Sequence, residues 1–119
     1  MIEGLDDAIV RKSIIDDTMI DNYWDFARMQ GTRQATLRRF ETPDDDFVAR
    51  NANSIVVPAL ILWGEEDRLV PLEAARLYAH AIRGSKLIIY PATGHLPQEE
   101  APDKSAADVR NFLLATSRW

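Results

Sequence analysis

The stretch "VVPALILWGEEDRLVP", residues 56–71, decides the fold of this chain. Its apolar part contains several β-branched residues and is closed by Gly64, as expected of a strand that is buried on both faces of a parallel sheet. An acidic turn with Asp67 follows directly. Catalytic and ligand-binding groups of open α/β sheets collect beyond the carboxyl ends of the strands, so Asp67 is a candidate site residue.

The residues after this turn alternate between helix and strand. Residues 71–82 begin with proline and predict a helix, residues 86–90 ("KLIIY") predict a second short strand, and a final helix is expected from about Pro102. This order predicts a βαβ unit with parallel strands. The apolar side chains at helical spacing are Ala74, Leu77, Tyr78 and Ala81 in the first helix, and Ala106, Val109, Phe112 and Leu113 in the second.

The loop after the second predicted strand, "PATGHLPQEEAP" (residues 91–102), carries one of only two histidines. Parallel strands bring the loops that follow them to one edge of the sheet, so Asp67 and His95 are expected to meet there. Taken singly, Asp67 fits an ordinary turn and His95 an ordinary loop. Together, a carboxylate would fix the imidazole tautomer, and the other ring nitrogen would accept a nucleophile's proton. Glu99 and Glu100 are expected to brace this loop or to cap the last helix.

The first third of the chain has a helical pattern instead. Residues 16–39 repeat apolar side chains at helical spacing, with Asp17 or Thr18 as the expected N-cap and Gly31 as the end of the first helix. A second short helix is expected to follow, and "ETPDDDF" (residues 41–47) predicts a solvated loop.

The composition excludes several classes of function. The net charge is −5 and the basic residues are dispersed, so we expect no nucleic-acid partner. The absence of cysteine removes disulfides and thiolate nucleophiles and is compatible with a reducing, cytoplasmic location. The acidic N-terminus does not read as a secretion signal. The longest apolar run, residues 55–63, is far shorter than the roughly 20 residues of a membrane span, so no membrane association is expected.

The turn Trp-Gly-x-x-Asp-x-x-x-Pro (residues 63–71), the Gly-His pair ending at His95, and the following Glu100 and Pro102 resemble the C-terminal part of the α/β-hydrolase fold. The resemblance extends from Val57 to about Leu114. It implies an α/β fold class, with a βαβ unit of parallel strands preceded by cap-like helices.

This resemblance also implies a division and a function for the chain. Residues 1–53 look like the latter portion of a helical cap, and residues 54–119 like the C-terminal strand-helix-strand-helix part of the core. Asp67 would be the acid and His95 the base of a catalytic triad, in a serine-hydrolase-like enzyme without a cofactor. The substrate would be an ester-like or other small, largely apolar molecule.

Three apolar residues flank the two catalytic candidates. Leu69, Val70 and Leu96 are candidates for lining a substrate pocket, with plain packing as the alternative for each. No metal site is predicted, because the two histidines lie in different elements without an i, i+4 pair or cysteine partners.

The sequence departs from the family pattern at the nucleophile. In this family the nucleophile sits on an elbow, G-x-S-x-G or an Asp-bearing counterpart, and neither elbow nor an oxyanion loop is present. We therefore expect a C-terminal fragment that is inactive alone. The alternative is a non-catalytic interaction module that forms a homodimer, or completes another chain, through its open sheet edge. None of the serines has the two glycines of the G-x-S-x-G pattern around it; they are Ser13, Ser54, Ser85, Ser105 and Ser117.

Overall fold

The computed structural model of the chain describes residues 2–41 and 50–116. Apart from Glu41, the loop predicted over residues 41–47 lies outside the described residues. Short 3-10 turns occur at Lys12–Ile14 (η1) and Ala52–Ser54 (η2). The helices and strands are α1 (Ile2–Ala8), α2 (Asp17–Arg28), α3 (Thr32–Glu41), β1 (Leu60–Gly64), α5 (Leu72–Ala81), β2 (Lys86–Tyr90), α6 (Pro97–Glu100) and α7 (Pro102–Thr116).

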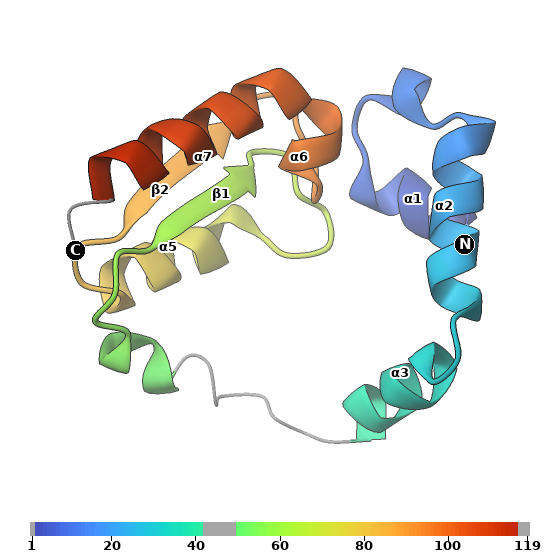
Figure 1. Cartoon of the computed structure of the whole chain (residues 1–119), viewed down its shortest axis with the longest axis horizontal. Helices are drawn as coiled ribbons and strands as arrows, with labels where there is room; N and C mark the ends of the chain where they lie inside the picture. The colour runs from blue at the N-terminus through green and yellow to red at the C-terminus, as the bar shows by residue number, and fades with distance from the viewer. Residues whose placement is uncertain (1, 42–49, 117–119) are drawn as a thin grey trace.

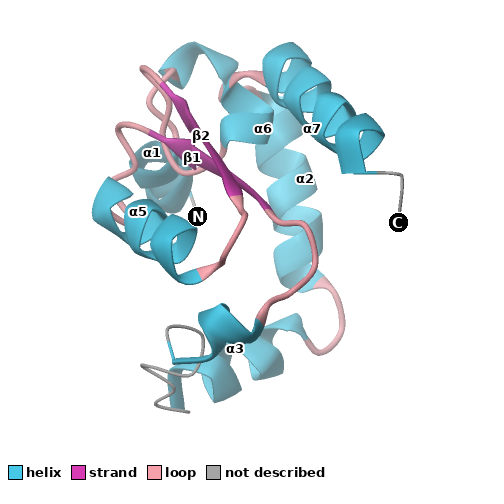
Figure 2. Ribbon diagram, turned by 90° about the vertical axis from the view of Figure 1, so that its left-hand side faces the viewer, coloured by secondary structure: helices cyan, strands magenta, loops and turns pink. Residues whose placement is uncertain are grey.

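A two-stranded parallel sheet forms the centre of the second half of the chain. β1 and β2 pair in a register that runs from Leu60 opposite Lys86 to Gly64 opposite Tyr90. The connection between them contains α5, so the predicted βαβ unit is confirmed. α5 and α7 lie on opposite faces of the sheet, and α1 lies beyond the carboxyl ends of the strands (Figures 1 and 2).

The first strand is shorter and less buried than the sequence predicts. It begins at Leu60, while Val56 and Val57 are 92% and 64% exposed. Pro58 accounts for the late start, because proline has no N–H with which to join the ladder. The prediction of a strand buried on both faces is wrong, since residues 60–63 are only half-buried beside a single partner strand.

The two helices on the sheet leave much of their apolar spacing exposed in the described structure. In α5 the buried residue is Ala75, while Leu77 is 70% exposed. In α7 the buried residue is Ser105, and Leu113 is 58% exposed. A hydrogen bond from the buried Tyr90 hydroxyl to Asp108 Oδ2, 2.7 Å long, fixes the face that α7 turns towards β2.

The helices of the first half, α1, α2 and α3, form an N-terminal arm with a small core where it meets the histidine loop. Leu5, Ala8 and Ile9 are buried together where α1 ends. The N-cap of α2 is Asp16, whose Oδ1 accepts a hydrogen bond from Met19 N at 2.8 Å. The prediction of Asp17 or Thr18 as the N-cap is therefore wrong. The predicted break at Gly31 is confirmed, with φ of +89° between α2 and α3. α3 extends away from the sheet (Figure 1).

Candidate functional site

Asp67 lies in the turn after β1 and is held by that turn. Its Oδ1 accepts hydrogen bonds from Leu69 N at 2.8 Å and from Val70 N at 2.9 Å. The Trp63 indole N–H donates to the Val70 carbonyl at 3.3 Å and closes the turn back onto β1. Short polar side chains often bond their own backbone in this way, and here the bonds fix the direction of the carboxylate.

The second carboxylate oxygen of Asp67 meets the imidazole of His95. Nδ1 of His95 lies 2.8 Å from Asp67 Oδ2. The Asp67 side chain is 3% exposed and that of His95 is 37% exposed. Within residues 2–41 and 50–116, Nε2 of His95 has no hydrogen-bond partner. A carboxylate on Nδ1 favours the tautomer in which Nε2 carries the lone pair that can take a proton.

The surroundings of Asp67 favour its ionised form. Burial alone would raise the pKa of this carboxyl group, but the hydrogen bonds from the Val70 amide, from His95 and from the Leu69 amide outweigh it. The pKa of Asp67 is therefore lowered below 3.8. An ionised Asp67 at neutral pH would stabilise an imidazolium on His95 whenever that ring accepts a proton.

Gly64 allows the turn after β1 and the histidine loop to touch. A Cβ on Gly64 would lie 1.8 Å from the Gly94 carbonyl oxygen and 2.3 Å from that of Thr93. The contact is completed by hydrogen bonds from Glu65 N to Tyr90 O and from Glu66 N to Thr93 O, both 2.9 Å long. Gly64 thus has a steric reason, which is the close approach of these two backbones, and Gly94 has a separate one, because a Cβ there would lie 2.3 Å from the Ala8 carbonyl oxygen.

Glu100 joins the histidine loop to the N-terminal arm. Its Oε1 accepts a hydrogen bond from Gly94 N at 2.6 Å, which confirms that it braces the loop. Its Oε2 accepts hydrogen bonds from Val10 N at 2.9 Å and from Arg11 N at 2.8 Å. The partners in the arm were not predicted, because the sequence offers no signal for a contact between residues about 90 positions apart.

The three apolar candidates for a substrate pocket lie in different surroundings. Leu69 is 50% exposed and Val70 is half-buried in the Asp67 turn. Leu96 packs against the buried cluster of Leu5, Ala8 and Ile9, so for this residue a packing role is observed. Contact of any of the three with a substrate stays a prediction.

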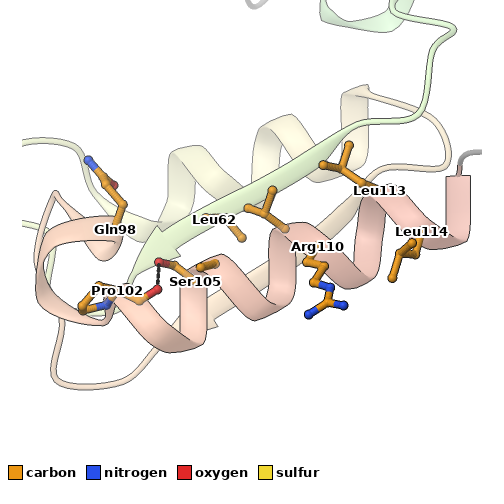
Figure 3. Close-up of a pocket in the computed structure, with 9 residues that line it drawn as sticks. Leu62, Gln98, Pro102, Ser105, Arg110, Leu113 and Leu114 are labelled. Carbon is orange, nitrogen blue, oxygen red and sulfur yellow. Dashed lines mark hydrogen bonds between the residues drawn. The ribbon is translucent and has the colours of Figure 1, made fainter.

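An open apolar groove lies between β1 and α7, apart from the Asp67–His95 pair (Figure 3). Its cavity volume is about 740 Å³. Ser105 in its wall donates its hydroxyl to the Pro102 carbonyl at 3.0 Å (Figure 3). Neither Asp67 nor His95 lines it. The residues that line it are Leu62, Gln98, Pro102, Ser105, Ala106, Val109, Arg110, Leu113 and Leu114.

Among residues 2–41 and 50–116, no three histidine or carboxylate side chains are grouped so that they could hold a metal ion. The same residues include no helix with the length and apolar character needed to cross a membrane.

Comparisons with known proteins agree with the fold. The family model of the α/β-hydrolase fold matches residues 10–102. An uncharacterized hydrolase of Bacillus subtilis, YugF, is 30% identical over 113 residues, which are 95% of this chain and 41% of YugF. A 2-hydroxy-6-oxononadienedioate/2-hydroxy-6-oxononatrienedioate hydrolase of Klebsiella pneumoniae is 44% identical over 68 residues, 57% of this chain and 23% of that enzyme.

Solved structures are similar over the same region. The CarC enzyme, a serine hydrolase involved in carbazole degradation, superposes with a TM-score of 0.73 at 28% identity, covering 85% of this chain and 41% of CarC. The meta-cleavage product hydrolase CumD gives a TM-score of 0.75 at 20% identity over 93% of this chain and 43% of CumD, which is a likeness of fold alone. The chain spans less than half the length of these relatives. The chain belongs to the α/β-hydrolase fold family.

Proposed function

We propose that this chain supplies the acid and the base of a hydrolase triad, with Asp67 as the acid and His95 as the base. The observation that carries the proposal is the 2.8 Å hydrogen bond between Nδ1 of His95 and Oδ2 of Asp67. Membership of the α/β-hydrolase family supports it, because a carboxylate that orients a histidine is the arrangement with which such enzymes activate a nucleophile.

In the proposed reaction, Nε2 of His95 removes the proton from a nucleophile that attacks the substrate carbonyl carbon. For a serine nucleophile, its Oγ forms the bond to carbon while the proton passes to His95. The imidazolium next to ionised Asp67 then returns the proton to the leaving oxygen, and a second cycle with water releases the acid product. For an aspartate nucleophile, His95 would activate the water that hydrolyses the covalent intermediate.

We place the nucleophile outside these 119 residues, on the part of the relatives that the chain does not match. The chain spans 41% of YugF and of CarC. Three of its serines use their hydroxyl protons elsewhere, since each donates to a backbone carbonyl. These donors are Ser54 to Asn51, Ser85 to Ala79 and Ser105 to Pro102.

We also propose a cap-like role for residues 1–53 and a core role for residues 54–119. The βαβ unit and α7 supply the strand-helix frame of the second part. In contrast, α1, α2 and α3 cover neither face of the sheet and stand to one side of it (Figure 1). An ester-like or other small, largely apolar substrate is proposed for the complete enzyme, in keeping with a monoacylglycerol lipase among the relatives. The relatives that hydrolyse dienoic acids point to a carboxylate-bearing substrate instead. A cytoplasmic location stays a prediction.

The proposal is tested by comparing this chain with the product of any open reading frame that continues upstream of Met1. Purified preparations would be assayed with p-nitrophenyl butyrate. The 119 residues alone should give no turnover above the blank. The longer product should turn over, and Asp67→Asn should lower kcat by about 10⁴-fold, the order seen when a triad acid is neutralised. Full turnover by a His95→Ala variant of the longer product would refute the proposal.

The alternative function is a non-catalytic module that pairs with a second copy. The observation in its favour is the open apolar groove, where Val109 is 37% and Leu113 is 58% exposed. Light scattering after size-exclusion chromatography separates the two functions. A stable dimer that Leu113→Glu converts to monomer would favour the module. A monomer, together with a longer product that shows no His95-dependent turnover, would refute both functions.

A further inference from the structure

Glu100 is a buried carboxylate outside the Asp67–His95 pair, and its hydrogen bonds reach the backbone next to His95. The residue is 4% exposed at the end of α6. One carboxylate oxygen accepts from Gly94 N at 2.6 Å, and the other accepts from Val10 N and Arg11 N at 2.9 and 2.8 Å. Burying a carboxylate is costly unless its oxygens are hydrogen-bonded, and these three donors meet that need.

Three more contacts tie the same loop to the same arm. The amide of His95 donates to the Ala8 carbonyl at 2.6 Å. A Cβ on Gly94 would lie 2.3 Å from that same carbonyl oxygen, so the two backbones touch without room for a side chain. Leu96 packs against the cluster that contains Leu5. Three successive loop residues are therefore docked where α1 ends.

The imidazole ring and the backbone of His95 are thus held by different elements. Nδ1 is held by Asp67 from the turn after β1. The backbone is held by Ala8 directly and by Val10 and Arg11 through Glu100. The Arg11 guanidinium adds a hydrogen bond to the Glu100 backbone carbonyl. If the bond to Gly94 is lost, the loop is anchored to the arm by fewer contacts, and the imidazole has more freedom to leave Asp67.

We propose that Glu100 is a positioning residue that holds His95 against Asp67 by fixing the histidine loop to residues 8–11 of the N-terminal arm. The duty this gives to His95 in catalysis rests on the proposed function, whereas the holding of the pair does not. The role requires a carboxylate: its oxygens only accept, so they serve all three amides at once. A glutamine would turn its NH2 group towards at least one backbone N–H and lose that bond.

The variant Glu100→Gln tests this role, and Glu99→Gln is its matched control. Both make the same chemical change in α6, and no described residue donates a hydrogen bond to the Glu99 carboxylate. The readout is the downfield proton resonance of the His95 Nδ1–H bound to Asp67, and the rate at which it exchanges with solvent. Asp67→Asn identifies the signal by abolishing it.

In Glu100→Gln the signal should vanish or exchange at least about tenfold faster, the factor for losing one hydrogen bond to a charged group. In Glu99→Gln it should be unchanged. Asp16→Ala, which removes the N-cap of α2 far from the loop in sequence, reports the effect of lower stability and should keep the signal. Wild-type exchange in Glu100→Gln would overturn the positioning role and leave the proposed function standing. A signal that survives Asp67→Asn would overturn the pair itself.

A measurement on the unmodified chain covers the case in which Glu100→Gln does not fold. Scalar coupling across the hydrogen bond between the Gly94 amide nitrogen and the Glu100 carboxylate carbon should be detectable, together with slow exchange of the Gly94 amide hydrogen. Absence of the coupling combined with exchange as fast as in an exposed loop would overturn the proposal.

Discussion

Replacing Gly64 by alanine should break the contact on which the Asp67–His95 pair depends. The new Cβ would stand 1.8 Å from the Gly94 carbonyl oxygen, where ordinary contact begins at 3.4 Å. The three nearest neighbours of the new methyl group, Gly94 O, Thr93 O and Gly94 C, are all backbone atoms, so no side-chain rotation can relieve the clash. The histidine loop has to move away from the end of β1.

The free energy of unfolding should fall by about 3–5 kcal/mol. Overpacking alone costs about 1–3 kcal/mol. Separation of the loop also removes the hydrogen bonds of Glu65 N to Tyr90 O and of Glu66 N to Thr93 O, each worth about 1 kcal/mol net. A loss of this size is a large part of the 5–15 kcal/mol by which ordinary domains are stable.

Urea unfolding followed by circular dichroism measures this loss, and Gly4→Ala is the control. Gly4 lies in α1, and a Cβ there would meet nothing within 4 Å. Alanine in a helix is favoured over glycine by about 0.5–1 kcal/mol, so the control should be slightly stabilised. An unfolding midpoint for Gly64→Ala equal to that of the wild type would refute the close approach of the two backbones.

Three other outcomes follow from the described contacts. Burial, and then the hydrogen bond to Asp108, raise the pKa of Tyr90 from 10.0 to about 12. The stability that Tyr90 contributes is complete below pH 10 and is lost as the pH rises towards 12. Tyr90→Phe should therefore reduce the loss of stability over this range, as measured by alkaline unfolding followed by tyrosinate absorbance. The pKa of Asp67 is lowered below 3.8, so its contribution is present above that pH and is lost as the pH falls through the lowered value; Asp67→Asn should weaken folding at pH 7 and reduce its loss in acid denaturation curves. Leu5→Ala, at a side chain 4% exposed, should cost about 2–5 kcal/mol in urea unfolding, whereas Leu77→Ala, at 70% exposed, should change the free energy by less than about 0.5 kcal/mol.

The parts of the fold that short-range patterns determine could be predicted from the sequence. The two strands, the helix between them and the break at Gly31 each depend on residues within one element or at its end. The meeting of Asp67 and His95 followed from one further rule, that parallel strands carry their loops to the same edge.

The parts that depend on distant partners could not be predicted in the same way. Apolar spacing indicates that a helix face will be covered, but not by what, and Leu77 and Leu113 remain largely exposed among the described residues. The resemblance singles out Glu100 together with Pro102, but it does not indicate what Glu100 binds. Only the folded chain shows this, because its donors Val10 and Arg11 lie at the opposite end of the sequence.

The hydrogen bonds of Asp67 also bear on the order in which the site assembles during folding. Its Oδ1 is bound by amides two and three residues further along the chain, whereas its partner His95 is 28 residues away. Closing so short a loop is far faster than pairing two strands across a helix. We therefore expect the Asp67 carboxylate to take up its final direction early in folding, as part of a local turn, before His95 reaches it. Pairing of β2 with β1 would then bring the His95 imidazole next to a carboxylate whose direction is already fixed.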